Sequence, residues 1–313
     1  MARRRAVAAS SRFPTQIVAR IVRVVVMLAL ILLIVLAGTG GFLTYRIVTA
    51  HNDTESVTPA SYLLNNYENF NFKDRAGGEH EGWLLLGLKG SPAIFLCHGY
   101  NSNKSELLSL GITLRENHFN VYVFNFYGPK VKSSFSNLGA RETADLLAAI
   151  EAVTQQPGVN PRRVGLFGVT TGGYAALVAA EKSNLVKAVA VDNAYDDPRQ
   201  MFEAQMDGLL GGSSSLFRIL TGTEFRMLNL GPSMPRIRDD LPKLANKPKL
   251  FISGRDMPSL AAATEDLWKD APEPKRLQPL EHSQPDLTSG FEKKEYENQV
   301  LTFFLHNLPL RAD

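Results

Sequence analysis

The run from Arg163 to Lys182 constrains the fold more than any other part of the chain. Its first part, RVGLF, is short, apolar and β-prone, whereas its last part, YAALVAAEK, is typical of a helix. Between them, Gly168 and Gly172 flank Thr170 with the spacing G-x-S-x-G, with threonine where that pattern has serine. A turn this abrupt needs glycine where the chain passes close to itself. The run therefore predicts a strand, a tight turn and a helix, with the hydroxyl of Thr170 at the end of the strand.

The alternation of apolar strand and helix extends over much of the chain. Strands are expected at 93–97, 121–126, 163–167, 188–191, 249–252 and 276–280, and helices at 105–116, 141–154, 171–182, 260–269 and 293–306. Strands this apolar, separated by helices, indicate an α/β fold with a mostly parallel sheet that is buried on both faces. Residues 193–246 interrupt the alternation, because they contain no clear strand and are rich in Met and Phe. They predict a helical lid inserted over the strand ends.

A membrane helix is predicted near the N-terminus. Residues 24–45 carry no charge, and at 1.5 Å per residue they span the ~30 Å hydrocarbon core of a bilayer. Six arginines precede this stretch, so the positive-inside rule places residues 1–23 in the cytoplasm and the main domain outside it. A cleaved signal peptide is the alternative, although the apolar stretch is long for one and Ala37-Gly38-Thr39 is a poor cleavage site.

The remaining chain is predicted to form a polar linker over residues 46–56 and one domain over residues 57–313. We expect the linker to separate the domain from the bilayer. Residues 1–46 hold seven arginines and no acid, so the basic pI comes from the tail and gives no support to nucleic-acid binding. A single cysteine, Cys97, excludes an internal disulfide framework. No H-E-x-x-H, H-x-H or G-x-x-x-x-G-K-[ST] spacing occurs, so neither a metal nor a cofactor is expected.

Chemically active side chains follow several of the predicted strands. In open α/β sheets, ligands meet the loops at the carboxyl ends of the strands. These loops hold Thr170, then Asp192, then Asp256 and finally His282. A hydroxyl, an acid and a histidine thus occur in the order Ser, Asp, His that a catalytic triad can take, with Thr in the first place.

Five runs together carry a family resemblance: FLCHGYNSNKS, LGARETADLLAAI, GLFGVTTGG, LFISGRDMP and PLEHS. In this order and spacing, residues 67–308 resemble the α/β-hydrolase superfamily, in particular its single-domain serine aminopeptidase-like and prolyl-oligopeptidase-like branch. The resemblance implies an α/β-hydrolase fold and a triad of Thr170 as nucleophile, His282 as base and Asp256 as the orienting acid. It also implies that the backbone N–H groups of Tyr100 and Thr171 form the oxyanion hole. Asp192 is the alternative acid, since some members place the acid one strand earlier.

The departure from the family pattern is Thr170. A β-branched residue at a turn with positive φ is strained, and its methyl group takes up space beside the attacking oxygen. Two functions follow. The first is a membrane-anchored hydrolase of carboxylic esters, less favourably of amides or peptides, with a small-molecule or lipid-like substrate. The alternative is a catalytically inactive binding or scaffold protein that retains the fold.

Overall fold

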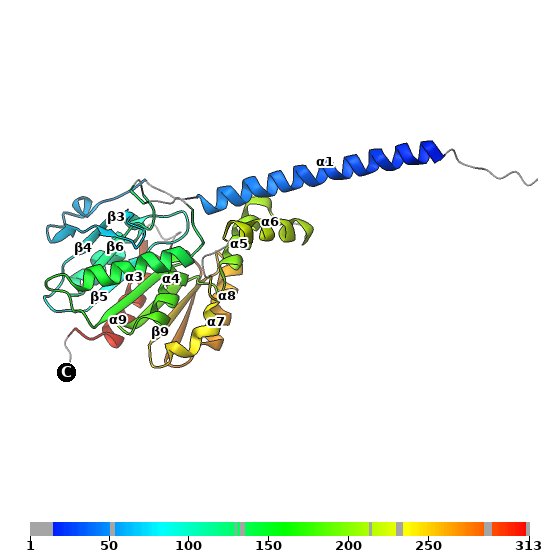
Figure 1. Ribbon diagram of the computed structural model, residues 1–313. Coiled ribbons are helices and arrows are strands. Elements are labelled where there is room, and N and C mark those ends of the chain that lie inside the picture. Colours follow the sequence, from blue (N-terminus) through cyan, green and yellow to red (C-terminus); the bar gives the residue numbers. More distant parts are fainter. Residues whose placement is uncertain are drawn as a thin grey trace, which may run out of the picture.

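Eight strands form the main sheet, in the order β1-β4-β6-β5-β7-β8-β9-β10 (Figure 1). The computed structural model describes residues 15–50, 54–128, 130–131, 135–212, 215–229, 234–284 and 290–310. The strands of the main sheet are β1 (Tyr67–Asn69), β4 (Gly82–Leu85), β5 (Ala93–Cys97), β6 (Asn120–Phe124), β7 (Val164–Val169), β8 (Val186–Asp192), β9 (Lys249–Gly254) and β10 (Lys275–Leu280). A small hairpin pairs β2 (Phe72–Lys73) with β3 (Glu79–His80).

The sheet is parallel from β6 to β10, and only β4 runs against its two neighbours. All residues of β5, β6, β7 and β9 are buried, as expected for strands covered on both faces. The predicted mostly parallel sheet is confirmed, and each of its six predicted strands is present to within a few residues.

Helices cover both faces of the sheet. One face packs against α3 (Ala140–Thr154), α4 (Thr171–Lys182) and α8 (Pro258–Asp270), and the other against α2 (Leu108–Glu116) and α9 (Gly290–Asn307). The short turn η2 (Lys104–Leu107) leads into α2, and η1 (Pro59–Tyr62) precedes the first strand. Because β5, β7, β8, β9 and β10 run parallel, their carboxyl ends lie at one edge of the sheet, where the candidate site lies.

The segment after β8 is helical, as predicted for the lid. It consists of α5 (Pro198–Leu210), α6 (Ser215–Leu228), α7 (Ile237–Asp240) and the turn η3 (Leu241–Leu244). Phe202 of α5 stacks on Phe225 of α6 at 4.6 Å between ring centroids, which joins these two helices. Both helices also contact the N-terminal helix α1 (Thr15–Val48).

The N-terminal helix is longer than the predicted span and enters the domain. Figure 1 shows α1 projecting from the domain, with α5 and α6 beside its C-terminal part. Ile47 and Val48, in its last turn, are buried in the core, and the carbonyl of Val48 accepts a hydrogen bond from the backbone of Ser136. Residues 46–48 therefore belong to the helix and not to a linker, and the apolar side chains of Ile47 and Val48 are packed in the domain. The helix is long and apolar enough to cross a membrane.

Candidate active site

Thr170 occupies a strained turn between β7 and α4. Its φ is 44° and its ψ is −106°, a backbone conformation that a β-branched residue rarely adopts. A Cβ on Gly168 would lie 2.2 Å from the carbonyl oxygen of Gly172, and one on Gly172 would lie 2.3 Å from the carbonyl oxygen of Cys97. Both glycines are therefore required by close backbone approaches. Strain of ~1–3 kcal/mol persists only where the surrounding structure enforces it, and it is concentrated at functional sites.

The predicted oxyanion donor meets the predicted nucleophile. The backbone N–H of Tyr100, in the loop after β5, donates to Oγ1 of Thr170 at 3.0 Å. Thr171 is the first residue of α4, so its N–H group belongs to the helix terminus, where backbone donors lack a partner inside the helix. Thr170 is only 2% exposed. The elbow thus holds a buried hydroxyl next to a backbone donor of the kind that stabilises an oxyanion.

Tyr100 also connects this site to the N-terminal helix. Its phenol hydroxyl donates to the carbonyl oxygen of Ile47 at 3.0 Å. Burial raises the pKa of Tyr100 to about 12, and the charge of Arg46 lowers it in part. The end of α1 is therefore hydrogen-bonded to the same residue whose backbone contacts Thr170, a relationship that no local sequence pattern signals.

His282 lies at the surface. Its Nδ1 is 3.0 Å from Oε2 of Glu292, which comes from the first turn of α9, and its side chain is 48% exposed. Within the described ranges, its hydrogen-bond partner is Glu292 rather than Thr170, Asp256 or Asp192. The structure therefore does not bring the ring of His282 to the hydroxyl of Thr170.

Asp256 is engaged by the residue that follows the histidine. Its Oδ1 accepts from the backbone N–H of Ser283 at 2.9 Å, and its Oδ2 accepts from the Ser283 hydroxyl at 2.8 Å. The carboxylate is close to the loop after β10, as predicted, but it holds Ser283 instead of an imidazole. Ser283 is fully buried, and the only sequence signal for it is its place next to His282.

Asp192 is the most deeply buried acid of the site. Its Oδ2 accepts from the backbone N–H of Gln284 at 2.8 Å and from the hydroxyl of Tyr296 at 2.6 Å. Burial raises the pKa of Asp192 to about 7, opposed by these two hydrogen bonds and assisted by the negative charge of Asp256. The side-chain amide of Gln284 donates a hydrogen bond to the carbonyl oxygen of Glu106. The loop after β10 thus crosses the strand ends by way of Asp256 and Asp192, and sequence reasoning missed Gln284 and Tyr296.

Two further side chains near the elbow are structural. His98 is buried, with Nδ1 2.9 Å from the carbonyl oxygen of Gly99 and Nε2 accepting from the backbone N–H of Phe126 at 3.0 Å. Burial lowers the pKa of His98 to about 4, so its ring is neutral at pH 7. Cys97 is fully buried, and burial raises the pKa of its thiol. Neither residue offers a nucleophile or a base.

A cluster of Asp74, His80 and Asp145 lies apart from these residues. Nε2 of His80 is 3.3 Å from Oδ2 of Asp74 and 3.8 Å from Oδ1 of Asp145, and the donor atoms lie within 4.8 Å of one another. Such a group could hold a metal ion by its geometry. However, the guanidinium of Arg141 already faces Asp145 at 3.9 Å, and burial raises the pKa of Asp145 to about 8, which makes it a poor metal ligand at neutral pH. We assign no metal to this cluster.

Known proteins share both the elbow region and the fold. The sequence profile of the prolyl oligopeptidase family matches residues 127–207, which contain the elbow. The uncharacterized protein YfhR of Escherichia coli O157:H7 is 27% identical over 252 residues, which cover 77% of this chain and 81% of that protein. The thiohydrolase aneE of Aspergillus aculeatus is 29% identical over 118 residues, or 36% of this chain and 37% of its own.

A solved structure extends the likeness to the whole domain. The Pyrococcus furiosus esterase Pf2001 has a TM-score of 0.62 at 15% identity, covering 82% of this chain and 98% of its own. At 15% identity, this similarity shows the fold alone. Together with the sheet order and the strained turn at Thr170, it shows that the chain has the α/β-hydrolase fold.

Proposed function

We propose that the protein is a membrane-anchored hydrolase of carboxylic esters, acting through an acyl-enzyme on Thr170. The observation that carries this proposal is the 3.0 Å hydrogen bond from the Tyr100 N–H to Thr170 Oγ1 at a strained, buried turn. A strained turn of this kind costs free energy and is found mostly at functional sites. The fold, shared with esterases, supports hydrolysis, and esters are the least demanding acyl substrates for a hindered threonine.

In the proposed reaction, Oγ1 of Thr170 attacks the ester carbonyl carbon and its proton passes to His282. The carbonyl oxygen gains a negative charge, which the N–H groups of Tyr100 and Thr171 stabilise by about 3 kcal/mol per donor. Collapse of this intermediate breaks the bond to the alcohol, which leaves with the proton held by His282. Water then adds to the acyl-threonine by the same route, releasing the acid and restoring the hydroxyl.

This reaction requires two local movements. The hydroxyl of Thr170 has to leave the Tyr100 N–H, because the substrate oxygen takes that position. His282 has to leave Glu292 and turn toward the elbow. Both side chains of this contact are about half exposed or more, and breaking such an exposed contact costs only about 0.2–1 kcal/mol. Catalytic hydrogen bonds are often absent or long before substrate binds.

A fluorophosphonate probe tests the proposal directly. The full-length protein, purified in detergent, is compared with the variants Thr170→Ala and Thr170→Ser, and turnover of short p-nitrophenyl esters is measured in parallel. We expect labelling of the wild type, no labelling of Thr170→Ala, and faster labelling of Thr170→Ser, because serine lacks the methyl group beside the attacking oxygen. A wild type and a Thr170→Ser variant that both stay unlabelled and inactive would contradict the proposal.

The proposed anchor is α1, oriented with residues 1–23 in the cytoplasm. Its mean hydropathy reaches 3.0 over 18 residues, and the arginines that precede the apolar stretch favour this orientation. We expect the protein to resist alkaline extraction from membranes, and a C-terminal alkaline phosphatase fusion to be active in bacteria. Release of a shortened chain into the soluble fraction would instead support a cleaved signal peptide.

A second function has specific support. Both oxygens of Asp256 are bound by Ser283, and His282 faces Glu292, so the described residues contain no assembled triad. This arrangement favours a non-catalytic binding protein that retains the fold. Activity gained only by Thr170→Ser would show that the remaining machinery is intact and that threonine suppresses it. Inactivity of both forms, with an acyl ligand that raises the melting temperature, would favour the binding function.

A further inference from the structure

We propose that α5 and α6 enter the bilayer beside α1, and that the cavity between them holds an acyl chain of a membrane lipid. This proposal rests on the membrane anchor proposed above, and it does not depend on catalysis by Thr170. It names the ligand class of this cavity, an acyl compound drawn from the membrane.

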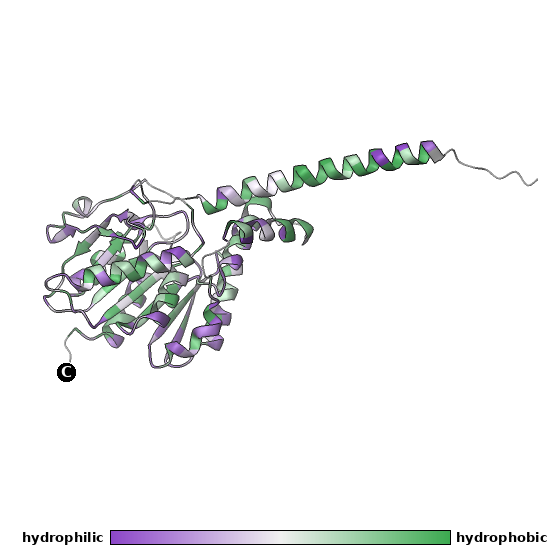
Figure 2. Ribbon diagram, viewed as in Figure 1, coloured by the Kyte–Doolittle hydropathy of each residue, from purple (hydrophilic) through white to green (hydrophobic). Residues whose placement is uncertain are grey.

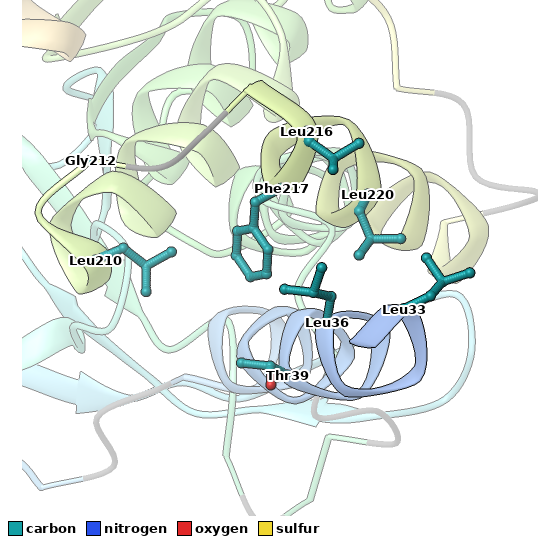
Figure 3. A pocket seen from close by; sticks show the side chains of 8 residues that line it. All are labelled: Leu33, Leu36, Thr39, Leu210, Gly212, Leu216, Phe217 and Leu220. Atoms are coloured by element: carbon teal, nitrogen blue, oxygen red, sulfur yellow. The ribbon is translucent and has the colours of Figure 1, made fainter. Parts of the chain in front are cut away.

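The cavity is apolar and has a volume of about 420 Å³. Figure 3 shows its side chains pointing toward one another from α1 on one side and from α5 and α6 on the other. Its lining residues are Leu33, Leu36, Thr39, Leu210, Gly212, Leu216, Phe217 and Leu220. The hydroxyl of Thr39 already donates to the carbonyl oxygen of Val35 at 2.8 Å. A ligand for this cavity therefore needs hydrocarbon and no hydrogen-bonding group, which describes an acyl chain.

The outer surface of α6 is also largely apolar, although Arg218 and Arg226 are exposed on it. Leu216 and Ile219 are 70% and 64% exposed, and Figure 2 shows this hydrophobic helix next to the hydrophobic part of α1. Other large apolar side chains exposed on α5 and α6 are Leu209, Leu210, Met227 and Leu228. Arg218 of α6 donates two hydrogen bonds, of 2.9 Å and 3.1 Å, to the carboxylate of Asp207 on α5. The two opposite charges therefore lie next to each other. A surface with this pattern is stable at a membrane and unfavourable in water.

The position of the cavity along α1 identifies the bilayer as the partner. Thr39 and Leu33 precede Tyr45, the end of the charge-free stretch, by 6 and 12 residues. At 1.5 Å per residue, these positions lie about 9 and 18 Å along the helix from that end, whereas half of a hydrocarbon core measures about 15 Å. When α1 spans the membrane, the bilayer therefore covers the cavity and the exposed face of α6 together.

Gly40 allows α6 to approach α1 closely. A Cβ at this buried glycine would lie 2.8 Å from Oε2 of Glu224 and 3.1 Å from Cγ2 of Thr221, both on α6. Seven residues further along the same helix, the carbonyl oxygen of Ile47 accepts a hydrogen bond from the hydroxyl of Tyr100. The backbone N–H of Tyr100 in turn contacts Thr170. The same helix thus lines the cavity and ends at Tyr100, whose backbone contacts the candidate nucleophile.

Depth-dependent fluorescence quenching tests the membrane position. Full-length variants Leu216→Cys, Ile34→Cys and Lys269→Cys are labelled with an environment-sensitive fluorophore and reconstituted into vesicles of phosphatidylcholine brominated on its acyl chains. Cys97 is buried and gives little background labelling. We expect the labels at positions 216 and 34 to lose most of their emission, and the label on Lys269→Cys, on the exposed side of α8, to keep it. Quenching at position 34 without quenching at 216 overturns the proposal, while quenching at neither position overturns the anchor as well.

Photocrosslinking tests the cavity. A phosphatidylcholine that carries a diazirine at the end of one acyl chain is reconstituted with the wild type and with two variants. Gly40→Phe forces α6 away from α1, whereas Gly38→Phe is the matched control, since a Cβ at Gly38 meets nothing within 4 Å. We expect crosslinks in α6 of the wild type and of Gly38→Phe, and their loss in Gly40→Phe. Equal crosslinking of all three proteins, or none in α6, overturns the proposal whatever the esterase assay shows.

Discussion

Tyr100 bridges Thr170 and the end of the N-terminal helix. Its backbone N–H lies 3.0 Å from Oγ1 of Thr170, and its phenol oxygen lies 3.0 Å from the carbonyl oxygen of Ile47. The position of the proposed oxyanion donor is therefore linked to a helix that the sequence alone assigned only to anchoring. This link leads to the first of four predictions.

Removing the Tyr100 hydroxyl separates the two contacts, because Tyr100→Phe keeps the backbone donor and loses the bond to Ile47. We expect a stability loss of about 1 kcal/mol and, for an active enzyme, a roughly ten-fold lower kcat from a less well positioned donor. Tyr122→Phe is the control, since its hydroxyl donates to the carbonyl of Phe70 in a remote part of the sheet. It should lose similar stability and no activity. An equal loss of kcat in both variants would mean that the contact of Tyr100 with Ile47 has no special role.

The elbow glycines give a prediction for stability alone. Gly172→Ala places a Cβ 2.3 Å from a carbonyl oxygen, so backbone has to move and we expect a loss of about 3 kcal/mol in the free energy of unfolding. Gly208→Ala in α5 meets nothing within 4 Å and should stabilise the protein by about 0.5 kcal/mol. Thermal unfolding of the two variants measures the contrast. A Gly172→Ala protein as stable as the wild type would show that the turn is less tight than described.

Asp192 predicts a pH dependence of stability. Burial raises its pKa from 3.8 to about 7, so the folded state favours the protonated carboxyl. The stability contributed by this group is complete below its unfolded pKa and is lost as the pH rises through about 7. Asp145 and Glu181, with pKa values raised to about 8 by burial, act in an overlapping range. Comparison with Asp192→Asn isolates the contribution of Asp192.

The difference in unfolding free energy between wild type and Asp192→Asn should therefore change by on the order of 4 kcal/mol between about pH 4 and pH 8, with the wild type losing stability. Urea unfolding at a series of pH values measures it. Parallel curves for the two proteins would show that Asp192 stays ionised in the folded state.

The contact between His282 and Glu292 gives a kinetic prediction. If His282 has to leave Glu292 to act as the base, Glu292→Gln weakens the competing contact and should raise kcat/KM by up to about five-fold, the equivalent of an exposed ion pair. His282→Ala should lower kcat roughly 10²–10⁴-fold. Glu295→Gln is the control, because Glu295 lines the same surface depression but binds Gln299. A His282→Ala variant with full activity would exclude His282 as the base.

Local patterns predicted the sheet well. The strands 93–97, 163–167 and 249–252 are apolar runs bounded by turn residues. The spacing of Gly168 and Gly172 around Thr170 predicted the turn, although the close approach at Gly172 is to Cys97, far away in the sequence. The same patterns could not predict the partner of His282. Whether its ring faces Thr170 or Glu292 depends on how the loop from 281 to 284 crosses the strand ends, and Asp256 and Asp192 direct that path through Ser283 and Gln284.

The predicted C-terminal end of the N-terminal helix was wrong for a related reason. Charge and hydropathy predicted a span that ends at Tyr45 and a linker that begins at Arg46. The burial of Ile47 and Val48 comes from contacts with residues some 50 and 90 positions further along the chain, Tyr100 and Ser136. Such long-range packing leaves no periodic signal in the segment itself.

The packing of α6 against α1 bears on how this protein could be released from a membrane. A cut near Ala37 to Thr39 would free the globular part but would remove Leu33 and Leu36, which form one wall of the cavity. The shed fragment would keep Thr170 and Tyr100 while exposing the leucines of α6 to water. If α1 is the proposed anchor, proteolytic shedding would therefore yield an aggregation-prone fragment whose apolar cavity has lost one wall.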